Sequence, residues 1–123
     1  MLSKRFNSKI RLAAVLIIIV CSFVLAAHWP VLSAKALSFD DQQYFINNGL
    51  VQTPGLASAR RFLTEILEPS TVAGYYQPLA MISLMLDYAL GGRENNLMPF
   101  HRTSLILHVA NTALIIVLLY LLF

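Results

Sequence analysis

The chain has 123 residues, of which 58% are hydrophobic and only 12% are charged. Soluble domains carry about 25% charged residues, so this composition argues against an ordinary soluble domain and favours a membrane protein. The formal net charge is +3, and a single cysteine, Cys21, excludes an intrachain disulfide.

A long apolar run follows a basic N-terminus. Residues 12–29 are 18 residues without Asp, Glu, Lys or Arg. As a helix they would extend about 27 Å, close to the roughly 30 Å of a bilayer core. No acidic residue precedes the run, whereas four basic residues do: Lys4, Arg5, Lys9 and Arg11. We therefore expect residues 1–11 to be cytoplasmic and residues 12–29 to be a transmembrane helix. A basic flank beside a span sets orientation more often than it binds nucleic acid, so no nucleic-acid partner is expected.

A cleaved signal peptide is the alternative to this span, because Ala34-Lys35-Ala36 fits a small-x-small cleavage pattern. The apolar run is longer than the usual stretch of about 7–15 residues, and that pattern lies well beyond its end. We therefore prefer an uncleaved span. With either interpretation the chain after residue 30 leaves the cytoplasm.

Residues 30–100 are expected to form an extracytoplasmic loop with short helices. The first covers about residues 40–48, and Asn48-Gly49 is interpreted as the turn that ends it. The second covers residues 58–68, with Ser58 as its N-cap and Pro69 as its stop.

The helix 58–68 carries one apolar stripe opposite the i, i+4 pair of Arg61 and Glu65. The stripe consists of Ala59, Phe62, Leu63, Ile66 and Leu67. Such a helix either covers the core of a small domain or lies flat in the membrane interface. Because it stands between two apolar segments, we expect the interface.

A third helix is predicted over residues 79–90, with Pro78 in its first turn and Gly91 after its end. It is apolar on all sides except for Ser83 and Asp87, and it is too short to span a bilayer. We expect a re-entrant or interface-buried helix, with Asp87 anchoring it.

Residues 101–123 form the second predicted span, which returns to the cytoplasm. Its polar residues recur at steps of three, four and three on one face: His101, Ser104, His108 and Asn111. Hydrogen bonding between helices is favoured over catalysis for this face, and its two histidines are too far apart on a helix to share a metal. The chain stops inside its own apolar stretch, so we expect the front of a longer protein whose remaining transmembrane helices lie beyond Phe123.

Two adjacent carboxylates, Asp40 and Asp41, stand in a polar stretch shortly after the first span. A carboxylate within hydrogen-bond reach of a hydroxyl can accept its proton as a general base. An acid that opens a short helix is also an ordinary N-cap. From these residues alone, capping is the simpler interpretation.

Short motifs follow one another along residues 36–119. They are Phe39-Asp40-Asp41-x-x-Tyr44, Asn47, Val51, Gly55-Leu56, Tyr76-Gln77-Pro78-Leu79, Ser83, Leu86-Asp87, Leu90-x-Gly92, His101 and His108-x-x-Asn111. In order and spacing they resemble the N-terminal part of the GT-C superfamily of membrane glycosyltransferases. The greatest similarity is to the protein O-mannosyltransferase-like branch with C-terminal tetratricopeptide repeats. Three positions depart from that pattern: Gln77 where a basic residue is common, Ser104 where Asn is common, and Gly49 where Pro is usual.

The resemblance implies an all-α membrane protein in which Asp40 is the catalytic base and Asp41 positions acceptor or donor. It implies substrate contacts from Tyr44, Tyr76 and Gln77. The donor would be a sugar, mannose or a similar one, on a polyprenyl or dolichyl phosphate, and the acceptor a protein hydroxyl. No metal or other cofactor is assigned. The expected location is a bacterial inner membrane, or else the endoplasmic reticulum, and we expect these 123 residues alone to be inactive.

Two other functions remain open. A two-span anchor or assembly subunit would bind partners through the face of His108 and Asn111. A small secreted module would result if the first apolar run were cleaved.

Overall fold

The computed structural model describes residues 2–35 and 40–122, with side chains from residue 9 onward. Phe39 and Phe123, which belong to the predicted acidic stretch and second span, lie outside the described residues. Within the described part the chain is mostly helical and has no strand. It divides into two units, residues 1–31 with 104–123 (unit 1) and residues 32–103 (unit 2).

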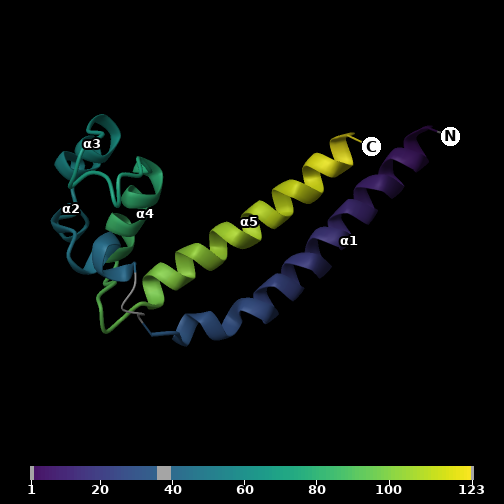
Figure 1. Ribbon diagram of the computed structural model, residues 1–123. Helices are drawn as coiled ribbons and strands as arrows, with labels where there is room; N and C mark the ends of the chain where they lie inside the picture. The colour runs from purple at the N-terminus through teal and green to yellow at the C-terminus, as the bar shows by residue number, and fades with distance from the viewer. Residues whose placement is uncertain (1, 36–39, 123) are drawn as a thin grey trace. The chain divides into compact units, whose positions relative to one another are not determined.

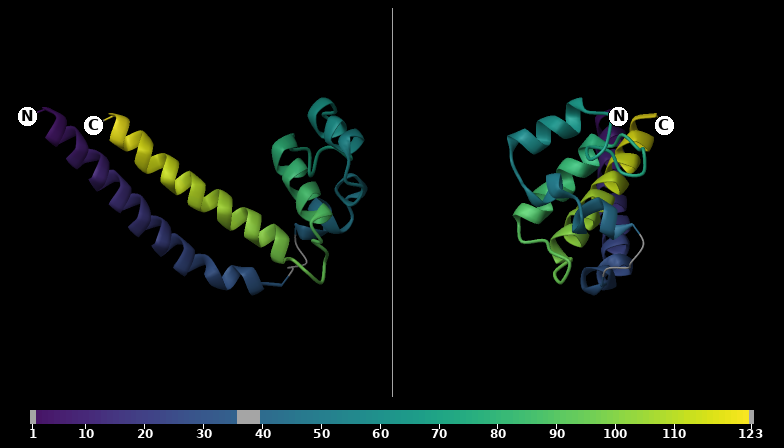
Figure 2. Two further views of the ribbon diagram at one scale, coloured as in Figure 1. Left: turned by 180° about the vertical axis from the view of Figure 1, so that it is seen from behind. Right: turned by 60° about the vertical axis from the view of Figure 1, so that its left-hand side comes forward.

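Unit 1 consists of two long helices that lie side by side (Figure 1). They are α1 (Leu2–His28) and α5 (Met98–Leu122), and the first residues of α5 belong to unit 2. The two run in opposite directions, so the start of α1 and the end of α5 lie at the same end of the pair (Figure 2). Both are long and apolar enough to cross a membrane, as predicted. A short 3-10 helix, η1 (Trp29–Ser33), follows α1.

Unit 2 is built around α4 (Pro78–Ala89), which contacts three other segments. These are the π-helical turn η2 (Gln42–Ile46), α2 (Gly49–Gln52) and α3 (Leu56–Thr64). Their shared core contains Phe45, Leu50, Val51, Phe62, Val72, Met81, Met85, Leu97 and Phe100. The apolar character of α4 is therefore explained in part by protein packing, which the prediction of a re-entrant or interface-buried helix did not include.

The two ends of α4 lie where the sequence predicts them. Pro78 is in its first turn, where its missing N–H costs nothing. After Leu90, Gly91 adopts a left-handed backbone with φ +97°. The amide of Gly91 then donates to the carbonyl of Tyr88 (3.1 Å), and the amide of Gly92 donates to the carbonyl of Asp87 (2.9 Å). This pair of hydrogen bonds is the Schellman motif that commonly ends a helix.

The segment around Gly49 differs from the prediction. The helical turn expected over residues 40–48 is shorter, and Gly49 begins α2 where a turn was expected. Asn48 is the N-cap of α2, because its Oδ1 accepts hydrogen bonds from the amides of Leu50 (3.1 Å) and Val51 (3.3 Å). Both of these residues are buried in the core, which explains why a new helix starts here.

The predicted bounds of the next helix were also wrong. The helix α3 starts at Leu56 and ends at Thr64, so Ser58 lies inside it, where its hydroxyl donates to the Thr53 carbonyl at 2.7 Å. Within the predicted stripe, Phe62 is fully buried in the core, whereas Ile66 and Leu67 follow the helix end and are exposed. Phe62 therefore covers the core of a small domain, the alternative to the expected membrane interface.

The pair of Arg61 and Glu65 forms as predicted, with Arg61 Nε 2.8 Å from a Glu65 carboxylate oxygen. The hydrogen bond from Arg61, together with one from Ser70 (2.7 Å), holds the pKa of Glu65 below its usual value. The pair is exposed, so it adds little to stability.

Candidate functional site

The two predicted catalytic carboxylates lie at the start of η2. Asp40 is exposed, and its backbone carbonyl accepts hydrogen bonds from the amides of Gln43 (3.0 Å) and Tyr44 (3.2 Å). Asp41 precedes the first residue of η2 and is half-buried, and its side chain forms no capping hydrogen bond. The side chain of Asp41 therefore does not cap this turn, and Asp40 contacts the turn through its backbone carbonyl.

Two of the three predicted substrate contacts meet across 33 residues of sequence. Gln77 Nε2 donates a hydrogen bond of 2.7 Å to the hydroxyl oxygen of Tyr44, and both side chains are partly buried. Gln77 sits just before α4 and Tyr44 lies on η2, so packing of η2 on α4 brings them together. The Tyr44 hydroxyl can therefore still donate a hydrogen bond, and the Gln77 amide oxygen can still accept one.

Tyr76, the third predicted substrate contact, has a different hydrogen-bond partner. Its hydroxyl donates to the Leu63 carbonyl of α3 at 2.7 Å, while the side chain as a whole stays about half exposed. Its hydrogen bond ties the segment before α4 to α3. The exposed side of its ring is the part that could meet a ligand.

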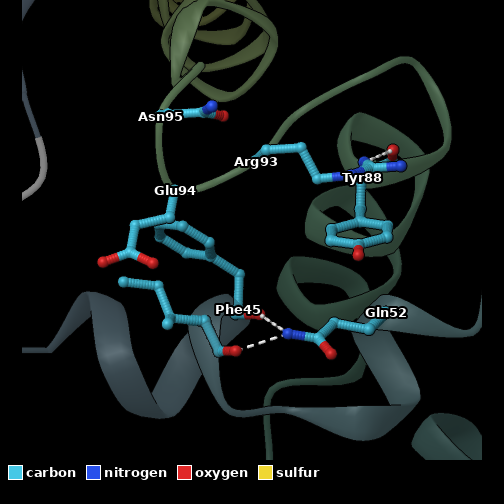
Figure 3. Close-up of a pocket in the computed structure, with 7 residues that line it drawn as sticks. Phe45, Gln52, Tyr88, Arg93, Glu94 and Asn95 are labelled. Carbon is cyan, nitrogen blue, oxygen red and sulfur yellow. Dashed lines mark hydrogen bonds between the residues drawn. The ribbon is translucent and has the colours of Figure 1, made fainter.

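An open cavity of about 560 Å³, which the sequence does not predict, lies beside η2 (Figure 3). Its lining residues come from η2, the ends of α2 and α4, and the turn after α4: Phe45, Ile46, Gln52, Tyr88, Arg93, Glu94 and Asn95. Gln52 Nε2 donates to the carbonyls of Phe45 (3.2 Å) and Ile46, which ties α2 to η2 along one wall.

Figure 3 shows the Arg93 guanidinium over the ring of Tyr88, with 3.8 Å between the guanidinium carbon and the ring centroid. The same guanidinium donates to the Tyr88 carbonyl at 2.6 Å. Arg93 is thus held in place on Tyr88, and Glu94 and Asn95 also line the cavity. An Arg, a Glu and amides beside aromatic rings can bind a hydroxyl-rich polar ligand. In the sequence, the pair Gly91-Gly92 precedes the turn that carries Arg93, Glu94 and Asn95. By itself this pair predicts only the end of a helix, not a cavity.

Asp87 is buried, with 3% of its surface exposed, and accepts a hydrogen bond of 2.5 Å from the Thr103 hydroxyl. Burial raises the pKa of its carboxyl, and the Thr103 hydrogen bond and the charge of Arg102 offset part of that rise. The bond joins α4 to the first turns of α5 within unit 2, which agrees with the anchoring role predicted for Asp87.

The predicted polar face of α5 is divided in the structure. His101 contacts the Ala34 carbonyl at 3.2 Å within unit 2. His108 meets the ring of His28 on α1, with the centroids 4.8 Å apart. Ser104 and Asn111 are exposed. Among the described residues no cluster of three or more His, Cys, Asp or Glu could hold a metal ion.

Comparisons with family models, with curated proteins and with solved structures found no match to this chain.

Proposed function

We propose that this chain is an integral membrane protein that supplies the catalytic loop of a glycosyltransferase using a polyprenyl- or dolichyl-phosphate sugar. Its two helices long enough to span a bilayer support the membrane location. The basic residues before α1 favour a cytoplasmic N-terminus and an extracytoplasmic unit 2. A bacterial inner membrane or an endoplasmic reticulum membrane fits this arrangement.

The hydrogen bond between Tyr44 and Gln77 is the observation that carries the proposal. It joins two motif segments of the GT-C resemblance, one with the acidic pair and one beginning with Tyr76. Such a contact is expected if both segments line one substrate site. Asp40 lies four residues before Tyr44 and is exposed to solvent, as a base that must meet an acceptor needs to be.

In the proposed reaction the hydroxyl of a protein acceptor attacks the anomeric carbon of the donor sugar. Asp40 takes the hydroxyl proton, the new glycosidic bond forms, and the bond to phosphate breaks with its electron pair leaving on the polyprenyl phosphate. Asp41 would orient acceptor or donor, and Tyr44, Tyr76 and Gln77 would contact the sugar. Mannose or a similar hexose is the proposed sugar.

The test replaces Asp40 by Asn in the chromosomal copy and measures transfer of labelled sugar from polyprenyl phosphate to protein in isolated membranes. Loss of a positioned base should lower the rate by about 10²- to 10⁴-fold. Glu68→Gln is the matched control, because Glu68 is an exposed carboxylate of the same unit and has no proposed role. Unchanged transfer in the Asp40 variant would remove Asp40 from the mechanism.

A non-catalytic anchor or assembly subunit is the second candidate function. The exposure of Ser104 and Asn111 on a predominantly apolar helix favours it, because polar side chains within a bilayer normally face protein. For an anchor, the Asp40 and Glu68 variants would behave alike in every assay, and disruption of the exposed polar positions would change assembly.

A further inference from the structure

One side of α5 carries a repeat of exposed residues. Six residues follow one another at steps of four, three, four, three and four, and we call them the outer seam: Ser104, His108, Asn111, Ile115, Leu118 and Leu122. This is the spacing of the a and d positions in a two-stranded coiled coil. The seam is about 27 Å long, comparable to the bilayer core.

A different side of α5 faces α1. Its half-buried residues are Val109, Thr112, Ala113, Ile116 and Tyr120. Cys21 Sγ of α1 lies 3.8 Å from the Val109 carbonyl oxygen, which identifies this side as the one packed on α1. Within the outer seam, the ring of His108 meets α1 through His28, as far as the described side chains of residues 9–28 show.

The outer seam is open to its surroundings. Ile115, Leu118 and Leu122 are 58%, 56% and 66% exposed, and Ser104 and Asn111 are exposed as well. Asn111 is near the middle of α5, roughly 20 Å from its first residue and 16 Å from its last at about 1.5 Å per residue. At that depth a carboxamide in contact with lipid would leave its donors and acceptor unsatisfied, which is costly.

We propose that the outer seam packs against the same seam of a second copy of this chain, with Asn111 facing Asn111. This rests on the membrane location of α5, which both candidate functions share. Copies with one topology present their α5 helices in parallel, so identical residues meet along the two-fold axis. An Asn side chain and a Ser hydroxyl can each donate and accept hydrogen bonds. Each can therefore form a hydrogen bond with the same residue of the second copy. A single Asn at one seam position also sets register and favours a two-stranded pair.

Cysteine crosslinking in native membranes tests the contact, in full-length protein carrying Cys21→Ser. Ile115→Cys and Leu118→Cys, both of which keep Asn111, should give a crosslinked dimer with a short bifunctional maleimide. Ala110→Cys and Val117→Cys are the matched controls, because both residues are exposed but lie about 120° or more around the helix from the centre of the outer seam. Equal crosslinking at all four positions, or none at the seam positions, would overturn the proposal.

Energy transfer between labelled copies in micelles, followed across detergent dilution, measures the strength of the pair. Asn111→Leu should lower the association constant by about 3- to 30-fold, the usual worth of a hydrogen bond between membrane helices, and Asn111→Gln should retain most of it. If Asn111→Leu leaves association unchanged, or if the seam positions crosslink only to a different protein, the pairing of two copies is wrong.

Alkaline extraction of the same membranes separates this proposal from its premise. Retention of the chain in the pellet without crosslinking at the seam overturns only the pairing of copies. Release into the supernatant overturns the membrane location and the seam together.

Discussion

Gly92 shows how closely two segments of unit 2 approach each other. A methyl group built at Gly92 would lie 2.5 Å from Cε2 of Phe100 and 2.8 Å from the Asp87 carbonyl oxygen. Phe100 also stacks on Phe45, with centroids 4.6 Å apart, so its ring cannot move without disturbing the core. A larger residue at position 92 would therefore clash with the Phe100 ring and the Asp87 carbonyl oxygen.

Gly92→Ala should destabilise unit 2 by about 1–3 kcal/mol, the usual cost of overpacking. Gly49→Ala is the control, since nothing lies within 4 Å of a methyl group at that position. It should be neutral or stabilising by up to about 1 kcal/mol, because Ala restricts the unfolded chain. Hydrogen exchange of α4 amides in the detergent-solubilised full chain gives both values, and equal protection in the two variants would contradict the crowding at Gly92.

The buried carboxyl of Asp87 should make the stability of unit 2 depend on pH. Its pKa in the folded chain is raised above the unfolded value near 3.8, so the folded state favours the protonated acid. The stabilisation is complete below pH 3.8 and is lost as pH rises through the folded pKa. Asp87→Asn should abolish this dependence, because the amide stays neutral and its oxygen can still accept from Thr103.

The measurement is hydrogen exchange of unit 2 at several pH values from 3.5 to 7, corrected for intrinsic exchange rates. The Glu94→Gln variant is the control for removing a carboxylate, because Glu94 is exposed. A wild-type profile that matches the Asp87→Asn profile would show that this carboxyl does not titrate with folding.

At the scale of elements, α2 is the helix that the sequence did not reveal. Asn and Gly are common both where a helix ends and where the next one begins, so Asn48-Gly49 is compatible with either role. The choice depends on Leu50 and Val51, whose burial against α4 requires them to continue as a helix. Burial of this kind depends on residues far away in the chain.

Asn48→Ala should lower the stability of unit 2 by about 0.5–2 kcal/mol, because two buried amides lose their acceptor. Asn47→Ala should have almost no effect, since Asn47 is exposed and its recorded bond, to the Gln42 carbonyl, is made by its backbone amide. Pulse proteolysis of the full chain across a urea series compares the two. Equal losses would show that the Asn48 side chain does not cap α2.

At the scale of the whole molecule, the proposed topology puts unit 2 and the start of α1 on opposite sides of the membrane. In full-length protein with Cys21→Ser, a membrane-impermeant maleimide should label Glu68→Cys in intact cells. Lys9→Cys should react only after the membrane is permeabilised. The reverse pattern would place Asp40 in the cytoplasm and would remove the proposed donor chemistry with it.

The sequence by itself determined the features that depend on neighbouring residues. The two long helices follow from apolar runs of bilayer length, and the bounds of α4 follow from Pro78 and Gly91. The pair of Arg61 and Glu65 follows from helical spacing. Each of these features depends only on residues within a few consecutive helical turns.

The tertiary structure alone decided which distant residues meet. Packing of η2 and α2 on α4 joins Tyr44 to Gln77, opens the cavity beside Arg93, and caps α2 with Asn48. It also buries Phe62, although its apolar stripe was expected to lie in the membrane interface. The physical reason is that an apolar stripe indicates that a helix face is removed from water. Whether protein or lipid covers that face depends on the packing of the whole unit.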